Sequence, residues 1–106
     1  METLLVITTL PDAASARALA ARLIEQRLAA CVNILPPWHS IYRWKGKVEE
    51  GDETPLFIKT GADRYAALEA AIRAGHPYEL PEIVAVGIGK GLPAYLDWVA
   101  RETAAE

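Results

Sequence analysis

The first third of the chain combines a short apolar run with an amphipathic stretch. Residues 4–10 are apolar and rich in β-branched side chains, and Pro11-Asp12 interrupts the run, which predicts a first strand. Asp12 is a suitable N-cap for a following helix. The apolar residues that then recur at helical spacing are Ala16, Leu19, Ala20, Leu23, Ile24 and Leu28. They predict an amphipathic helix with one apolar face.

The next segment predicts a long hairpin. Residues 30–44 have an extended pattern, and Pro36-Pro37 predicts a break at a sheet edge, because proline donates no ladder hydrogen bond. Lys45-Gly46 is a tight turn, and residues 48–60 form the returning strand. A strand as long as residues 30–44 would reach about 50 Å, which exceeds a small domain. The hairpin therefore either bends sharply or extends past its own core, and an extended tip would pack on a neighbouring subunit.

The remaining pattern predicts a helix, a loop, a strand and a final helix. Apolar residues at helical spacing precede Gly75, and residues 76–82 form a loop with two prolines. Residues 83–88 are apolar without alternation, which predicts a central strand buried on both faces. The final helix carries Leu92, Tyr95, Leu96 and Val99.

The resulting order is strand, helix, strand, strand, helix, strand, followed by a terminal helix. This βαββαβ order predicts an α+β, ferredoxin-like sandwich, with two helices on one face of a four-stranded antiparallel sheet. We expect residues 1–106 to form one domain with one hydrophobic core.

Composition narrows the function classes. A hydrophobic fraction of 52% excludes a disordered chain, and a net charge of −3 without a basic stripe disfavours nucleic-acid binding. The single cysteine excludes an intrachain disulfide framework. The N-terminal run lacks the features of a signal peptide and is too short to span a bilayer, so we expect a cytoplasmic protein without membrane contact. Three Trp and four Tyr suggest that some apolar surface serves a partner.

Three side chains are of types that bind borderline metal ions: Cys31, His39 and His76. None is spaced from another as in a zinc motif, which disfavours a preformed site within one chain. His39 has the pattern of a loop residue without a partner, and Cys31 that of a small buried apolar residue. His76 is the better metal candidate, because Tyr78 and two glutamates share its loop. Alternatively, His76 caps the second helix or forms local hydrogen bonds.

No catalytic motif is present, so the sequence predicts a protein that is not an enzyme. Neither serine lies in a nucleophile motif, and no glycine-rich loop follows the first strand. The stretch 87–91 with Lys90 is either an anion-binding corner or ordinary turn chemistry. Lys59, on an apolar strand, either meets a carboxylate or ligand or lies on the open face of the sheet.

Several short motifs follow one another in a specific order. They are the stretches 28–33 (LAACVN) and 40–47 (SIYRWKGK), then His76-Pro77-Tyr78, Pro81-Glu82-Ile83 and Tyr95-Leu96-Asp97-Trp98, together with Thr9, Pro11, Glu53 and Lys59-Thr60. In this order they resemble the CutA divalent-cation-tolerance family, and the resemblance covers almost the whole chain.

The resemblance implies a tight homotrimer with long hairpins that link the subunits, similar in architecture to the PII signalling trimers. It also implies clefts between subunits. By position, the cleft residues would be Cys31, Tyr42, Trp44, Lys59, His76, Tyr78, Glu82, Tyr95 and Trp98. The family is associated with tolerance to copper and other divalent ions, and some members bind copper.

The chain departs from the family at two positions. Members with proposed copper ligands carry a cysteine where this chain has Thr8 and a histidine where it has Gly75, which leaves His76 alone. One imidazole implies weak binding of copper or another divalent cation and no required cofactor.

Two functions remain open from sequence. The leading one is a homotrimeric, non-enzymatic binding protein in the response to metal ions, which holds a small ligand or a divalent cation at its inter-subunit clefts. The alternative is a PII-like signalling or scaffold trimer that binds a small anionic metabolite. An acylphosphatase-like hydrolase is disfavoured, because the first strand is not followed by an anion-binding loop.

Overall fold

The computed structural model describes residues 2–105, so Met1 and Glu106, the two ends of the expected domain, lie outside the described residues. In chain order the elements are β1 (Thr3–Leu10), α1 (Ala13–Glu25), β2 (Cys31–Ile34), β3 (Trp38–Trp44), β4 (Lys47–Gly61), a 3-10 turn (Ala62–Arg64), α2 (Tyr65–Gly75), β5 (Ile83–Ile88) and α3 (Pro93–Glu102). Within residues 2–105, no helix is long and apolar enough to cross a membrane.

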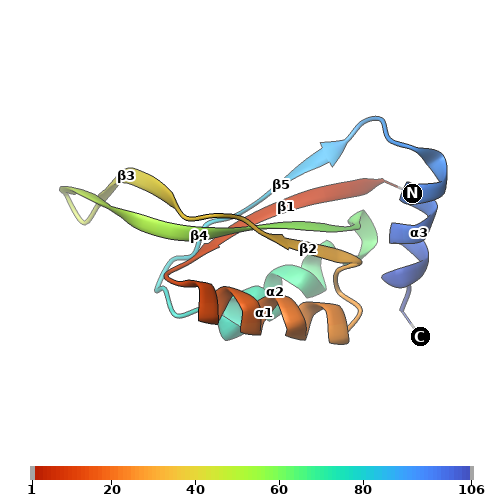
Figure 1. The fold of residues 1–106 in the computed structure, drawn as a ribbon, viewed down its shortest axis with the longest axis horizontal. Coiled ribbons are helices and arrows are strands. Elements are labelled where there is room, and N and C mark those ends of the chain that lie inside the picture. Colours follow the sequence, from red (N-terminus) through yellow and green to blue (C-terminus); the bar gives the residue numbers. More distant parts are fainter. Residues whose placement is uncertain (1, 106) are drawn as a thin grey trace.

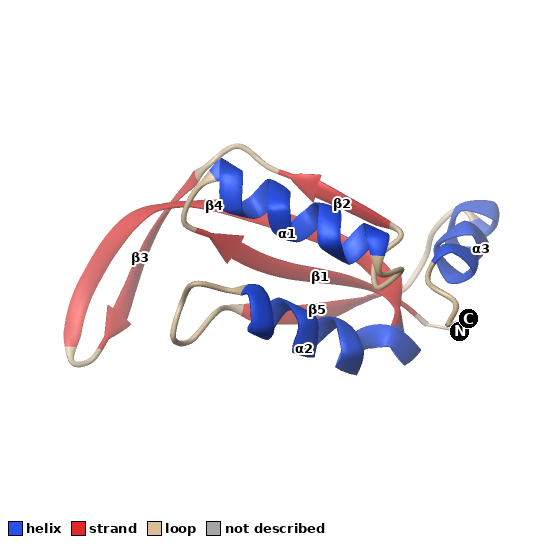
Figure 2. Cartoon of the chain, turned by 90° about the horizontal axis from the view of Figure 1, so that it is seen from below, coloured by secondary structure: helices blue, strands red, loops and turns tan. Residues whose placement is uncertain are grey.

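The sheet confirms the predicted α+β, ferredoxin-like topology. Its strand order is β2-β4-β1-β5, and all pairings are antiparallel. Helices α1 and α2 cover one face of this sheet (Figure 2). The core between these layers includes Val6, Leu56 and Ile58 from the sheet with Leu23 and Leu68 from the helices, all fully buried. Helix α3 packs at the end of the molecule away from the hairpin (Figure 1).

Side-chain caps determine two of the helix ends. Asp12 is the N-cap of α1, as predicted, and its carboxylate accepts a hydrogen bond of 2.7 Å from the Ser15 amide. This bond to the ionised form lowers the pKa of Asp12. At the other end of α1, Arg27 adopts a positive φ of 58° and its guanidinium donates to the carbonyl oxygen of Arg101 at 2.9 Å. The α1–β2 turn thereby caps the C-terminus of α3.

The long hairpin extends past the core, which confirms one of the two predicted outcomes. Strand β4 has 15 residues, and its N-terminal half pairs with β3 from Trp44↔Lys47 to Trp38↔Glu53. Pro36-Pro37 separates β3 from β2 as expected. The hairpin projects from one end of the sheet (Figure 1), and the molecule measures 44 × 26 × 23 Å.

Strand β5 lies at an edge of the sheet, so the prediction of a central strand buried on both faces was wrong. It pairs with β1 and with no other strand among the described residues. Val84 and Val86 are 48% and 54% exposed. The helices cover only one face of the sheet, and nothing in residues 2–105 covers these valines on the other. The continuous apolar pattern therefore marks a second apolar face that this chain leaves open.

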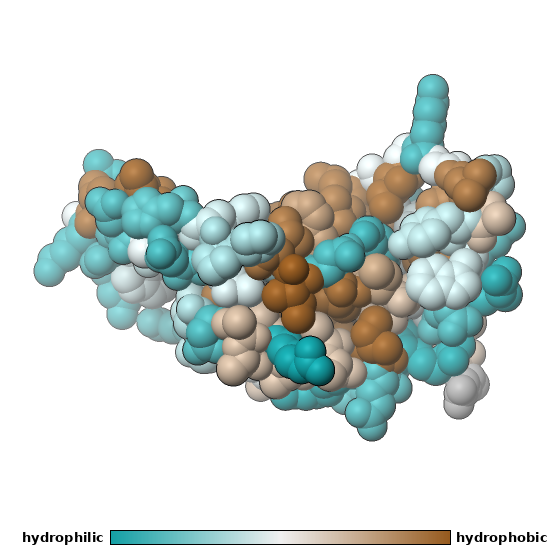
Figure 3. Space-filling model, in the orientation of Figure 1, coloured by the Kyte–Doolittle hydropathy of each residue, from teal (hydrophilic) through white to brown (hydrophobic). Residues whose placement is uncertain are grey.

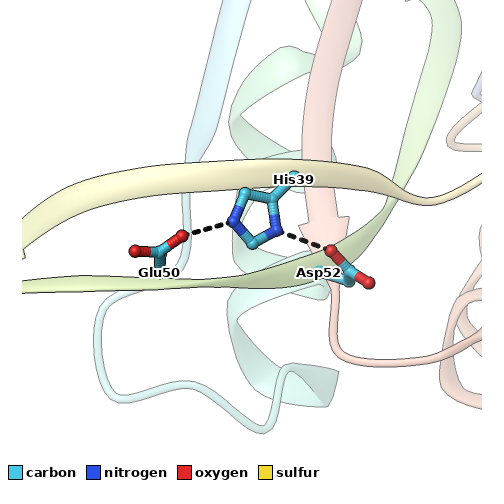
Figure 4. A network of polar contacts seen from close by, with 3 residues as sticks. All are labelled: His39, Glu50 and Asp52. Atoms are coloured by element: carbon cyan, nitrogen blue, oxygen red, sulfur yellow. Dashed lines mark hydrogen bonds and ion pairs between the residues drawn. The ribbon is translucent and has the colours of Figure 1, made fainter.

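His39 lies within β3 and not in a loop without partners, which corrects a second expectation. Its Nδ1 is 2.7 Å from Asp52 Oδ1 and its Nε2 is 2.7 Å from Glu50 Oε1 (Figure 4). Two carboxylate acceptors on one ring favour the imidazolium form, in which both nitrogens donate. These hydrogen bonds, the Glu50 bond foremost, raise the pKa of His39. The ring thus links the two strands of the exposed hairpin.

Two buried threonines in neighbouring strands differ in one respect. Thr8 on β1 and Thr60 on β4 are both fully buried. The Thr60 hydroxyl donates to the carbonyl oxygen of Leu28 at 2.8 Å. The Thr8 hydroxyl has no hydrogen-bond partner among the residues that the structure describes. The buried threonine hydroxyl is therefore hydrogen-bonded at position 60 but not at position 8.

Substituting each threonine by isosteric valine tests this difference. We expect Thr8→Val to raise the free energy of unfolding by about 1 kcal/mol, because an unpaired buried hydroxyl is removed. Thr60→Val should lower it by about 1 kcal/mol, because a buried hydrogen bond is lost. Urea unfolding of both variants and the parent chain, at one protein concentration, measures the two changes in the free energy of unfolding. Equal effects of the two substitutions would contradict the assignment.

Candidate functional site

A cavity of about 680 Å³ lies between the hairpin and the loop that joins α2 to β5. Its lining residues are Thr9, Ser40, Ile41, Tyr42, Trp44, Glu53, Pro77, Tyr78, Glu79, Leu80 and Glu82. Strand alternation explains most of the hairpin's share, because Ser40, Tyr42 and Trp44 lie on one face of β3. Ile41 also borders the cavity, although it lies on the other face of the strand. His39 lies on the opposite face, so its carboxylate pair is outside this cavity.

Glu53 is the most enclosed carboxylate of the cavity. The Thr9 hydroxyl donates to Glu53 Oε2 at 2.9 Å across a part-buried contact. Burial and the nearby negative charge of Glu53 raise the pKa of Tyr78. The Thr9 hydroxyl therefore holds Glu53 in place at the point where the hairpin leaves the sheet, with Tyr78 nearby.

His76 uses both ring nitrogens for backbone hydrogen bonds. Its Nε2 lies 2.7 Å from the carbonyl oxygen of Thr9, so Nε2 carries a proton and donates. Its Nδ1 accepts from the amide of Tyr78 at 3.1 Å, so this nitrogen is unprotonated. The ring is therefore the neutral Nε2–H tautomer, and burial lowers the pKa of His76. This geometry matches the local hydrogen-bonding role considered from sequence.

A lysine of the hairpin turn reaches the rim of the cavity. Lys45 Nζ lies 3.4 Å from Glu79 Oε2 and 5.5 Å from the centroid of the Trp44 ring. Both side chains of the ion pair are largely exposed, so the pair contributes little to stability. It shows that a primary ammonium fits against this carboxylate and this ring together.

A second cluster lies on the same open face of the sheet, at the α3 end. Lys59 donates to the Asn33 side-chain oxygen. No carboxylate of residues 2–105 pairs with it, and it occupies the open face of the sheet, as one alternative predicted. Cys31, half-buried, lies directly across from Lys59 in the strand register. Burial and the neighbouring Cys31 sulfur raise the pKa of Tyr95, whose ring stacks 5.5 Å from that of Trp98.

The nine residues predicted to line one cleft thus form two clusters. Tyr42, Trp44, Tyr78 and Glu82 line the cavity, with His76 behind them. Cys31, Lys59, Tyr95 and Trp98 form the other cluster. Lys59 lies six positions after Glu53 along β4, which corresponds to about 20 Å of extended chain. Within one chain, the nine residues therefore do not line a single cavity.

Several residues that line the cavity are absent from the cleft that the resemblance predicts, although some of them belong to the quoted motifs. These are Thr9, Ser40, Ile41, Glu53, Pro77, Glu79 and Leu80. The period-two alternation of β3 would have identified Ser40 beside Tyr42. Glu53 belongs to the motifs of the resemblance, but its place in the cavity follows only from the register, which sets it opposite Trp38.

The residues of one chain do not fit a tight copper site. Within residues 2–105, no three histidine, cysteine or carboxylate side chains converge on one point. Thr8 is buried in the core, and a Cβ at Gly75 would lie 2.3 Å from the Arg22 guanidinium. Thr8 and Gly75 replace two of the family's proposed copper ligands, and no other group of metal-binding side chains within residues 2–105 takes their place.

Comparison with known proteins shows similarity over nearly the whole chain. A family model described as CutA1 divalent ion tolerance protein matches residues 4–102. The divalent-cation tolerance protein CutA of Thermus thermophilus is 47% identical over 98 residues, which cover 92% of this chain and 95% of that protein. Protein CutA of Mus musculus is 44% identical over 90% of this chain, which spans only 54% of the mouse protein.

Solved structures of similar proteins have the same fold. The Thermus thermophilus protein superposes with a TM-score of 0.93 at 45% identity, covering 96% of this chain and 99% of that one. CutA1 from Oryza sativa gives a TM-score of 0.95 at 37% identity, with coverages of 100% and 97%. The matched motifs, the matched fold and these identities place this chain in the CutA1 divalent ion tolerance family.

Proposed function

We propose that the chain acts as a homotrimeric, non-enzymatic binding protein in the response to divalent cations, with its ligand clefts at subunit interfaces. The observation that carries this proposal is the division of the nine cleft residues into two clusters on one open sheet face. The number of subunits follows the family resemblance. The expected cytoplasmic location stays a prediction.

The surface between the two clusters supports assembly. The register places Phe57, Ile7 and Val84 in one row across the sheet, and Lys59, Leu5 and Val86 in the next. Hydrophobic side chains gather over the middle of the molecule, whereas the hairpin is more hydrophilic (Figure 3). An apolar sheet face of this kind, with an unpaired edge strand, requires a cover. A second copy of the chain supplies a matching apolar face.

Direct metal binding is proposed to be weak. His76 must release a backbone partner before a ring nitrogen can bind an ion, and no second ligand of the family's proposed copper set is present. The cavity carboxylates do not converge on one point. Copper or another divalent cation would therefore bind with low affinity and without a strict preference.

The PII-like alternative is not favoured by the cavity. Three glutamates line it, and no lysine, arginine or histidine does. Such a surface repels an anionic metabolite.

Substitution of Val86 tests the assembly. We expect Val86→Glu to dissociate the trimer into folded monomers, because a carboxylate would be buried without a partner. Ile24→Glu is the matched control, since Ile24 on α1 is 43% exposed but lies on the other side of the sheet. Sedimentation velocity distinguishes the species. A monomeric parent chain, or a trimer that tolerates Val86→Glu, would refute the proposal.

The two histidines should titrate in opposite directions. We expect the pKa of His39 to lie above 6.5 and that of His76 below it, with His76 as the Nε2–H tautomer. Because the folded pKa of His39 is raised, His39 stabilises the fold below pH 6.5, and this contribution is lost as the pH rises through that folded pKa. Because the folded pKa of His76 is lowered, His76 reduces the free energy of unfolding as the pH falls below 6.5.

Nitrogen-detected NMR of the histidine rings measures both pKa values, and zinc added to the same sample tests metal binding. Weak binding predicts that the His76 signals shift only at zinc concentrations above about 10 μM. Stoichiometric saturation of His76 at lower concentrations would contradict it.

A further inference from the structure

We propose that the cavity between the hairpin and the α2–β5 loop binds a small aliphatic diamine or polyamine. The inference deepens the proposed function by naming a ligand class for one of its two clusters. It depends on contacts within a single chain and therefore does not require the trimer.

The charge of the cavity selects a cation. Glu53, Glu79 and Glu82 line it, and its lining contains no basic side chain. Glu53 is the enclosed member, and the Thr9 hydroxyl donates a hydrogen bond to it at 2.9 Å. A carboxylate that is already oriented loses little entropy when it accepts hydrogen bonds from an ammonium group.

The walls of the cavity suit an organic cation. Tyr42, Trp44 and Tyr78 contribute aromatic rings, and Ile41 and Leu80 contribute apolar surface. Aromatic faces attract ammonium groups, and apolar walls accommodate the methylene chain between two such groups. The volume of about 680 Å³ falls in the range of small-molecule sites.

A lysine of this chain already makes the contacts that we propose for the amine. Lys45, an alkyl ammonium, pairs with Glu79 at 3.4 Å and lies over Trp44 at 5.5 Å. A free amine would make the same two contacts, and a second ammonium of the same molecule could then reach Glu53 or Glu82. Lys45 therefore competes with the ligand for the rim.

The dispersed carboxylates distinguish this ligand from a metal ion. A metal needs ligands within about 2–2.6 Å of one centre, and the described residues contain no such convergence. Carboxylates that line one cavity without converging match charges that are spread along a chain.

Calorimetric titration of the intact protein tests the proposal. The probes are cadaverine and spermidine, with pentanediol as a neutral control and glutarate as an anionic control. We expect saturable binding of both amines, one per chain, and no binding of either control.

Two pairs of variants locate the site. Glu53→Gln should weaken amine binding by about tenfold, the size expected for one charge-assisted contact. Glu50→Gln also removes one negative charge, but on the other face of β4, and should change the affinity for the amines by less than about twofold. Lys45→Ala should strengthen amine binding by about threefold, because a competing cation is removed. Lys90→Ala removes the same charge outside the cavity and should leave amine binding unchanged.

The outcomes separate this inference from the proposed function. Sedimentation of the same samples reports the oligomeric state. The inference alone is overturned if the protein is a trimer that binds neither amine. It is also overturned if the trimer binds the amines but Glu53→Gln and Glu50→Gln reduce the affinity equally. A monomer that binds them overturns the trimer and leaves the inference standing.

Discussion

The rest of the structure depends on the pairing of β4 with three other strands. Its C-terminal half pairs with β1 and β2 in the sheet, and its N-terminal half pairs with β3 in the hairpin. Pro36-Pro37 divides the partner strand, while β4 continues without a break through Thr54 and Pro55, which are buried. The hairpin is therefore a direct continuation of the sheet, and it brings β3 opposite the α2–β5 loop.

The cavity forms at that junction because three backbone segments meet there. Thr9 lies near the end of β1, directly across from Pro55, and its hydroxyl and carbonyl bind Glu53 and His76 respectively. His76 in turn positions Tyr78 through the amide that donates to its Nδ1. This one threonine thus connects the hairpin to the loop. The histidine that resembles a metal ligand in the sequence acts in the fold as a link between two backbones.

Local periodicity was sufficient to predict most of the fold. The helical stripe after Asp12, the proline break and the length of the hairpin all correspond to observed elements. The pattern of β5 misled because it records that both faces are apolar, but not whether another element of the same chain covers each face. Helices α1 and α2 supply one cover only. For the site, the resemblance supplied residue positions, whereas their division into two clusters depends on register and chain separation, which no local pattern contains.

The geometry also changes how tolerance to divalent cations can be understood in this chain. An imidazole whose two nitrogens are engaged by backbone groups binds a metal only when the loop that holds it opens, and that opening reduces the net affinity. The same loop lines a cavity whose carboxylates are already oriented and whose walls are aromatic. Binding at the cavity requires no such opening. The cavity of this chain therefore has the features expected of a site for an extended cation, as proposed above, whereas its histidine lacks those of a preformed metal ligand.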